Sequence, residues 1–236
     1  SLSYSSRSGN GIAGVGWSIS AGSSIHRCGQ TVAQDGRSYA VTYDAVEDRL
    51  CLDGQRLIAV SGSYGQSGAV YKTELDRFAR ITQSGGINSG SSSFTVEAKS
   101  GKVSYYGTEI DSKHKAGGRS ETLTWALERI EDLSGNRIDY DYIEYGEGEW
   151  LLDKIEYTGK ASRGDRAVSF IYESADRPDG KVSYLAGGKT EKTKRLKRIE
   201  TSYQNSVLRK YNLTYGTLSG ATKRSVLRSV QECSQI

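Results

Sequence analysis

The chain has 236 residues, of which 36% are hydrophobic and 25% charged, and its formal net charge is +4. It contains 28 Gly and 16 Tyr but one Pro and no Met, a composition typical of many short, half-exposed β-strands joined by glycine turns. No stretch reaches the roughly 18 apolar residues that a membrane span requires, so we predict no transmembrane segment.

The first residues already have the pattern of a strand, at Leu2–Tyr4, and the sequence starts without Met. It also lacks the charged and apolar regions of a signal peptide. We therefore interpret it as a segment of a longer polypeptide, and we expect any export signal to lie outside it.

Residues 8–27 are rich in glycine, and an alternating pattern that starts at Trp17 predicts a strand directly after the glycines. The spacing Gly9-x-Gly11-x-x-Gly14 matches the dinucleotide-binding fingerprint, but that motif needs a following helix, which the sequence does not predict. We interpret the segment instead as a corner of a sheet. We expect Trp17 to fill it and Arg27 to bind the carbonyls of its loop.

Turn dipeptides predict hairpins in the next region. Asp35-Gly36 indicates pairing of residues 31–33 with 37–43, and Asp53-Gly54 indicates pairing of 49–52 with 55–60. Further along, the pattern predicts a strand at 70–81, a mobile loop at 84–93, a hairpin between 94–97 and 102–106, and a flexible polar connection at 111–120.

The second half of the chain repeats itself. Four similar segments occur, at Leu127–Glu131, Leu152–Glu156, Leu196–Glu200 and Leu227–Gln231. The first three are each followed by a turn and an aromatic strand, so we predict stacked β-hairpins from about residue 121 to 236, with an insert at 173–193. The predicted fold is all-β with few or no helices. Residues 1–236 would be a single module of successive antiparallel hairpins, forming a curled extended sheet or a sandwich-like structure.

Charge is unevenly distributed along these hairpins. Residues 121–156 contain 11 carboxylates and 3 basic side chains, whereas residues 187–228 contain 11 basic side chains and 2 carboxylates. We expect the two regions to complement each other or adjacent modules. The basic run Lys189–Arg198 has no interleaved aromatic residue, which favours a solvated face over a nucleic-acid site.

The residue types that carry catalysis or bind metals do not form a recognised pattern. His26 with Cys28, and His114 alone, fall short of the four ligands of a zinc site and suggest no catalytic triad. Residues 132–136 (DLSGN) have oxygens at alternate positions, as calcium loops do, but they also fit an ordinary turn, which we favour. The sequence therefore predicts no catalytic residue, no metal and no cofactor.

Three cysteines, Cys28, Cys51 and Cys233, leave two possibilities open. One is a single disulfide with a free thiol, and the other is three unpaired, partly buried thiols. We favour the unpaired thiols, and the redox compartment stays undecided.

Several motifs resemble the SpvB-type domain, the N-terminal part of the B components of insecticidal toxin complexes and of related RHS/YD-repeat proteins. They are residues 2–6 (LSYSS), 8–11 (SGNG), 14–20 (GVGWSIS), 48–57 (DRLCLDGQRL), 132–142 (DLSGNRIDYDY) and 155–158 (IEYT), with Trp125 and Leu127. The resemblance covers nearly the whole chain.

The resemblance implies a β-rich, non-enzymatic module that begins the wall of a large hollow shell around a toxic C-terminal segment. It implies a secreted or cell-surface location, and as partners the adjacent modules and other toxin-complex components. We expect no small-molecule substrate, and the basic run disfavours nucleic acid as a partner. Glu147-Gly148-Glu149 resembles the Glu-x-Glu motif of ADP-ribosyltransferases. The Ser-Thr-Ser element of those enzymes is missing, however, so we interpret this motif as an acidic hairpin tip.

Two other functions remain as alternatives. Trp17, Trp125 and Trp150 could form the aromatic platform of a carbohydrate-binding module, although their alternating positions favour use in a core. The basic hairpins could bind nucleic acid, in which case binding would depend steeply on salt.

Overall fold

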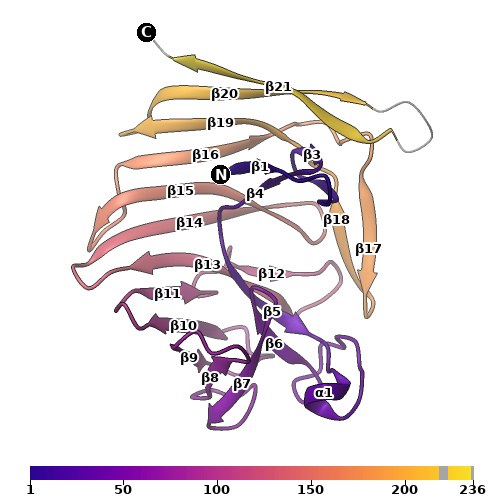
Figure 1. Cartoon of the computed structure of the whole chain (residues 1–236), viewed down its shortest axis with the longest axis vertical. Coiled ribbons are helices and arrows are strands. Elements are labelled where there is room, and N and C mark those ends of the chain that lie inside the picture. Colours follow the sequence, from indigo (N-terminus) through magenta and orange to yellow (C-terminus); the bar gives the residue numbers. More distant parts are fainter. Residues whose placement is uncertain (218–222, 235–236) are drawn as a thin grey trace.

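The computed structural model describes residues 1–217 and 223–234. Strands β1 to β21 make up nearly all of its regular structure, and the one helix in the described residues is α1 (Val32–Asp35) (Figure 1). The all-β prediction with few helices is confirmed. Within the described part of the chain, no helix is long and apolar enough to cross a membrane.

A closed barrel forms the lower half of the molecule in Figure 1. It closes because β13 pairs with β5 through Thr124–Ala126 and with β11 through Leu127–Glu131. The barrel strands, in the order of their pairing, are β5 (Ser24–Cys28), β6 (Arg49–Leu52), β7 (Gln55–Ser61), β8 (Val70–Thr73), β9 (Ala79–Ser84), β10 (Ser93–Ala98), β11 (Val103–Tyr106) and β13 (Thr122–Glu131).

The interior of the barrel is apolar, with one buried charged group on β5. Burial alternates along β5, so that Ile25 and Arg27 both lie inside. The largest enclosed side chain is Trp125, which packs edge-to-face on Phe94 with ring centroids 5.2 Å apart. The core of this region joins residues from every barrel strand, as expected for a small barrel filled by side chains.

An extended antiparallel sheet continues from the barrel toward the top of Figure 1. It begins where β14 pairs with the end of β13 and stops at β21. Its strands are β14 (Asn136–Tyr145), β15 (Glu149–Lys160), β16 (Arg166–Tyr172), β19 (Leu196–Tyr203), β20 (Ser206–Thr217) and β21 (Ser225–Ser234). The first three sequence repeats lie in β13, β15 and β19, and the fourth lies in β21. The strands β13, β15 and β19 pair with β14, β16 and β20, which confirms the predicted hairpins.

Three short pairs of strands lie outside the barrel and the extended sheet. They are formed by β1 (Leu2–Tyr4) with β4 (Trp17–Ile19), β2 (Asn10–Gly11) with β3 (Gly14–Val15), and β17 (Lys181–Leu185) with β18 (Gly188–Lys192). A second core lies beneath the opening segment, with Ala13, Phe170, Tyr172, Leu196 and Leu213 at its centre. The glycine-rich segment is thus a lid on the sheet, and close packing requires Gly14, where a Cβ would come within 2.8 Å of the Ser225 carbonyl oxygen.

The prediction of a hairpin across Asp35-Gly36 is wrong. Residues Val32–Asp35 form α1, and pairing between the two expected strands is limited to one bridge, Gln30 with Tyr39. Gly36 adopts a left-handed conformation (φ 71°) and its N–H donates to the Val32 carbonyl, which is the arrangement of a helix C-terminus. The other hairpin, at Asp53-Gly54, is confirmed by the pairing of Leu52 with Gln55.

Three other local predictions need correction. Residues 70–81 form two strands, β8 and β9, separated by a turn in which Phe78 has φ 56°. The loop at 84–93 is packed, with Ile87 and Ser92 buried. The connection at 111–120 contains a further strand, β12 (Lys113–Lys115), which pairs with β13. In each case the local structure depends on tertiary contacts, which the sequence pattern of the segment does not show.

The preference for three unpaired thiols is also wrong. Cys28 and Cys51 lie on the paired strands β5 and β6 and form a disulfide, while Cys233 on β21 is free. The sequence separation of 23 residues gave no sign of this contact, because it depends on how β5 and β6 pair. The disulfide links two neighbouring strands of the barrel wall.

Candidate functional site

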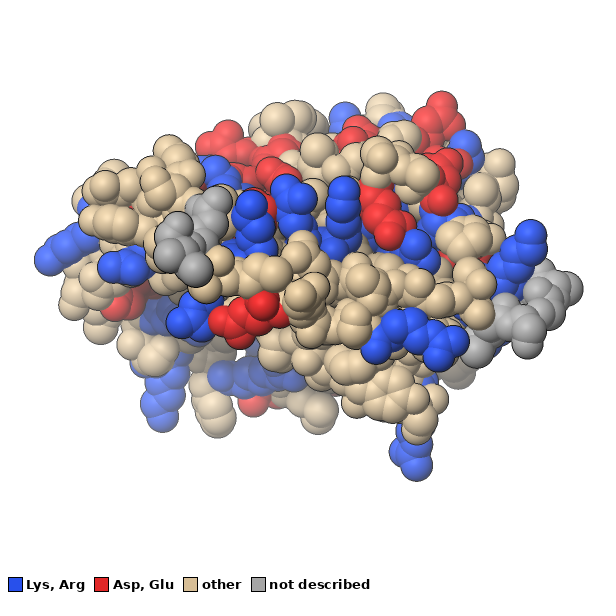
Figure 2. Space-filling view, turned by 90° about the horizontal axis from the view of Figure 1, so that it is seen from above, with Lys and Arg blue, Asp and Glu red and all other residues tan. Residues whose placement is uncertain are grey.

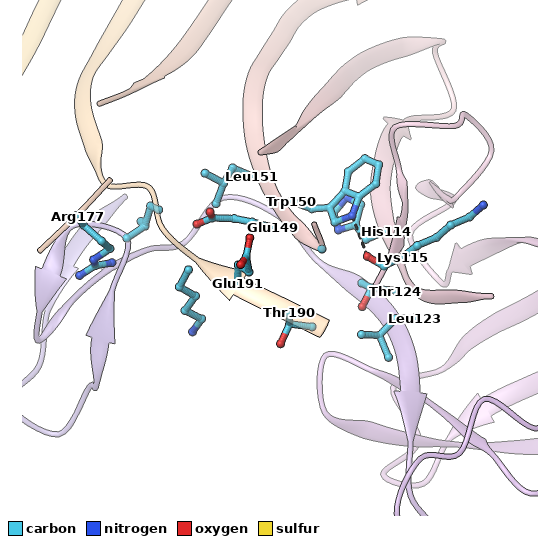
Figure 3. A pocket seen from close by; sticks show the side chains of 13 residues that line it. His114, Lys115, Leu123, Thr124, Glu149, Trp150, Leu151, Arg177, Thr190 and Glu191 are labelled. Atoms are coloured by element: carbon cyan, nitrogen blue, oxygen red, sulfur yellow. Dashed lines mark hydrogen bonds between the residues drawn. The ribbon is translucent and has the colours of Figure 1, made fainter. Parts of the chain in front are cut away.

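A cavity of about 330 Å³ lies between the barrel and the extended sheet. It is bordered by β12 and β13 on the barrel side and by β15 and β18 on the other (Figure 3). The labelled side chains show Glu149 and Glu191 near the middle of the view, with Arg177 on one side and Trp150 with His114 on the other. This is the place where titratable and aromatic groups from both halves of the molecule meet.

His114 is part of the wall of this cavity and not of a flexible loop. Its ring stacks on Trp150 with centroids 4.8 Å apart and an angle of 9°, and it meets Tyr142 edge-to-face at 4.9 Å. Burial lowers the pKa of His114 to about 4, against the weaker opposing effect of a hydrogen bond that the ring donates to the Asp111 backbone. The ring is therefore neutral at physiological pH, and its buried Nε2 has no hydrogen-bond partner among the described residues.

The Glu147-Gly148-Glu149 motif lies at the turn between β14 and β15, as predicted for a hairpin tip, but its second carboxylate is buried. Glu149 accepts hydrogen bonds from the Thr193 N–H (2.8 Å), the Thr193 hydroxyl (2.5 Å) and the Lys194 N–H (3.0 Å). Glu147 is largely exposed and lies 3.4 Å from Lys189 Nζ. Since both oxygens of Glu149 are occupied, its role is to hold the start of β19 against the β14–β15 turn.

The other residues singled out in the sequence also have structural partners. Asp132 accepts from the N–H groups of Ser134 (2.8 Å) and Asn136 (2.9 Å), which confirms the turn at 132–136. His26 is half-buried on β5, and burial lowers its pKa, with Asp53 opposing. Among the described residues, no group of three or more His, Cys, Asp or Glu side chains is placed to hold a metal ion.

Arg27 does not bind the opening loop. It is buried inside the barrel, where its guanidinium donates to Asp48 (2.9 Å) and to the carbonyls of Thr122 (2.7 Å) and Ile87 (2.9 Å). Asp48 in turn accepts from the Thr42 and Tyr43 N–H groups. The pair therefore joins the loop at residues 42–48, the loop at Ile87 and the start of β13.

The arginine that does bind the opening loop is Arg177, which the sequence analysis missed. It donates to the Gly11 carbonyl (3.0 Å) and to Asn10 Oδ1 (2.8 Å), and it pairs with Asp179 at 2.8 Å. Asp179 also accepts from the Ser225 N–H at 2.6 Å. The sequence feature that could have pointed to Arg177 is the pair of oppositely charged residues on either side of Pro178, the one proline of the chain. We call Arg177, Asp179, Asn10 and Ser225 the clasp.

A row of mostly polar residues runs along the face of the extended sheet that the opening segment does not cover. One row of directly paired residues crosses all its strands, namely Asp141, Lys154, Ser169, Glu200, Lys210 and Cys233. We call this row the polar ladder. Lys154 and Arg163 each form ion pairs with both Asp141 and Glu156. Figure 2 looks down on the β21 end of the molecule, and basic and acidic side chains lie interleaved on one side of it.

Charge complementarity between the two halves is limited to a few contacts. Lys189 with Glu147 is an ion pair between the acidic and basic regions, and Glu149 binds backbone at Thr193 and Lys194. Most basic side chains of the run at 189–198 pair nearby instead, as Lys194 does with Asp176 and Arg195 with Glu173. The run is thus mostly neutralised within its own region.

A family model described as Salmonella virulence plasmid 65kDa B protein (SpvB) matches residues 1–177. The N-terminal domain of effector protein SpvB from Salmonella typhimurium strain LT2 superposes with a TM-score of 0.79 at 16% identity, over 100% of this chain and 93% of that one. No curated protein matches the sequence.

Two toxin structures share the fold. The TcdB2-TccC3 structure matches with a TM-score of 0.80 at 15% identity, and the Photorhabdus luminescens Tc holotoxin pore with 0.75 at 15%. In both, 98% of this chain is covered but only 14% of the other chain. The predicted resemblance is confirmed, and the chain belongs to the SpvB family.

Proposed function

We propose that the chain is a non-catalytic structural module of a large secreted or surface-delivered toxin-like protein, forming part of a β-shell around a toxic segment. The observation that carries this proposal is the edge at β21. Among the described strands, β21 pairs with β20 alone, so its outer peptide groups can pair with a strand of an adjacent module. The fold occurs in TcdB2-TccC3 as a small part of a much larger chain, which supports this role.

The polar ladder supports the enclosing role. Asp141 and Lys154 of the ladder pair across strands at 3.7 Å, and Glu200 pairs with Arg198 of its own strand at 2.7 Å. The row presents no contiguous apolar surface. A loosely folded polypeptide binds tightly where it finds apolar anchors. A wall with such a polar face would therefore enclose a cargo without binding it tightly.

The absence of catalysis is part of the proposal. It is supported by the condition of the titratable groups in the cavity, because Glu149 is held by three donors and Glu191 pairs with Lys189 at 2.7 Å. The carbohydrate alternative has no observation in its favour. Trp125 is fully buried, Trp150 is stacked on His114, and Trp17 packs on Tyr4 at 5.4 Å.

The proposal is tested in the full-length parent protein by the substitution Val230→Lys on β21. Val230 is 45% exposed, and a lysine on an edge strand opposes strand addition. We expect assembly, followed by size-exclusion chromatography and electron microscopy, to be reduced. The control is Leu208→Lys on the interior strand β20, a residue of 46% exposure. Normal assembly of the Val230 variant would contradict the proposal.

The coding sequence on either side of this segment gives an independent test. Tyrosine-aspartate repeats downstream would support the shell. A glycosidase domain there would instead favour a carbohydrate-binding role.

A further inference from the structure

A second cavity, of about 590 Å³, lies beside the opening segment on the side of β17 and β18. Three distant parts of the chain line it: residues 6–10, the insert from Arg177 to Lys192, and Arg224 just before β21. We call it the basic cavity, because Lys181, Lys192 and Arg224 border it along with the Arg177–Asp179 pair.

The clasp gives this cavity a fixed wall. The side chains of Arg177 and Asp179 are 2% and 3% exposed. The Asn10 amide donates to Asp179 at 2.7 Å, and the Ser225 hydroxyl donates to the same carboxylate at 2.7 Å. Since Asp179 is engaged on both oxygens, its charge offsets that of Arg177 and is not free to balance the other basic groups.

The remaining positive charge is uncompensated. Lys181 and Lys192 are directly opposite each other in the β17–β18 pair, and like charges in that position are destabilising. Within the described residues, no carboxylate lies within 4.0 Å of the charged groups of Lys181, Lys192 or Arg224. The segment 218–222, which precedes Lys223 and Arg224, has the sequence LSGAT and contributes no acidic side chain.

Hydrogen-bond donors are available at the same place. Ser6 and Ser8 line the cavity, and their hydroxyl groups make no hydrogen bond with another described residue. At Gly9 an added Cβ would meet nothing within 4 Å, so the loop borders open space. In proteins, phosphate oxygens accept hydrogen bonds from hydroxyl groups and ammonium groups such as these.

We propose that the basic cavity binds a phosphate group, held between Lys181 and Lys192 with Arg224 and the serine hydroxyls as further donors. The cavity exceeds the size of one phosphate ion, and ligand pockets for small molecules have about this volume. The phosphate can therefore be a free anion or part of a small phosphorylated molecule. The inference does not depend on the shell function, because it concerns a cavity away from β21's outer edge and the polar ladder.

The test is isothermal titration calorimetry of the 236-residue chain at low ionic strength, with inorganic phosphate, pyrophosphate and ATP as probes and sodium chloride as the reference. We expect saturable binding of at least pyrophosphate. Lys181→Gln and Lys192→Gln should each weaken it about tenfold or more, because each removes a charge-assisted hydrogen bond. The control Lys102→Gln removes an exposed lysine of the barrel that has no ion pair within the described part of the chain, and it should leave the affinity unchanged.

Folding of the variants is checked by melting them without anion. Both cavity variants should melt at or above the temperature of the unsubstituted chain, since each relieves repulsion between the two lysines. Tighter binding of ATP than of pyrophosphate would indicate a phosphorylated molecule, and equal binding would indicate the free anion. The proposal would be overturned if the heats were no larger than those of sodium chloride, or if Lys102→Gln weakened binding equally. It would also be overturned if a Glu-rich peptide bound and phosphate did not.

Discussion

The barrel and the extended sheet are built from the same kind of hairpin, but they differ in how they protect strand edges. In the barrel, β13 pairs on both sides, so every strand edge is satisfied within the ring. In the extended sheet, hairpins add in one direction and stop at β21, and one face is covered by residues from the start of the chain. The barrel is thus complete by itself, whereas the sheet depends on segments from elsewhere and offers an edge for more.

The fastening groups follow the same division. Arg27 and Asp48, both 0% exposed in their side chains, hold the barrel loops from inside. The clasp of Arg177 and Asp179 holds the opening segment and the start of β21 onto the sheet from outside. The two ion pairs with the least exposed side chains therefore lie where distant segments of the chain are joined.

The largest effect is expected for Arg27→Ala. It leaves the Asp48 charge buried without its partner, and it should lower the free energy of unfolding by about 4 kcal/mol. Urea unfolding measures the loss. Hydrogen exchange should show β5 to β11 losing protection first. A loss below about 1 kcal/mol would mean that the pair does not hold the barrel together.

Asp179→Asn should weaken the extended sheet and leave the barrel protected. We expect a loss of about 3 kcal/mol, because Arg177 keeps a buried charge without its counter-ion. Hydrogen exchange should increase in β1 to β4 and at the start of β21. Equal loss of protection in the barrel would contradict the division into two regions.

The same substitution should change the acid sensitivity of the chain. Burial raises the pKa of Asp179, but hydrogen bonds from Arg177, Ser225 and Asn10 outweigh burial and hold it well below the ordinary range. Its contribution to stability is present above the pKa of the unfolded state, about 4, and is lost as the pH falls below that value. The Asn variant should lose less stability between about pH 4 and pH 2 than the unsubstituted chain.

His114→Phe tests the junction between the two regions. Burial lowers the pKa of His114 to about 4, so the unfolded chain takes up a proton near pH 6.5 while the folded chain does not. Stability should therefore fall as the pH drops from about 6.5 to 4. The Phe variant keeps the stacking and should be spared roughly 2 kcal/mol of that fall. Identical pH profiles would show that His114 is not held neutral at the junction.

The smallest effect is expected for Arg209→Ala. Arg209 pairs with Glu232 at 2.8 Å, but both side chains are more than half exposed, at 59% and 51%. Exposed pairs contribute about 0 to 1 kcal/mol. A loss comparable to that of Arg27→Ala would remove the distinction between buried fastening pairs and surface pairs.

The sequence predicted those features that depend on local chemistry. The hairpin at Asp53-Gly54 follows from a two-residue turn, in which Asp53 and Gly54 have φ of 48° and 80°. The four repeats predicted the extended sheet for a similar reason, since each carries its own strand pattern. The family followed from motifs of several residues each.

Features that depend on distant partners could not be predicted. Barrel closure requires β13 to pair with both β5 and β11. Nothing in the sequence of residues 122–131 indicates that this strand has two partner strands. Arg27 was assigned to a nearby loop but reaches Asp48 and Ile87, and His114 was placed in a flexible segment although it stacks on Trp150. At Asp35-Gly36 the same turn signal that succeeded at Asp53-Gly54 failed, because Gly36 ends a helix there.

The most direct test of the central claim is amide hydrogen exchange of β21, in this chain alone and in the assembled full-length protein. If β21 receives a strand from an adjacent module, its outward amides should exchange at least about tenfold more slowly in the assembly, while the barrel strands keep their rates. Unchanged exchange along Ser225–Ser234 in a fully assembled particle would contradict the proposal that this edge continues the wall.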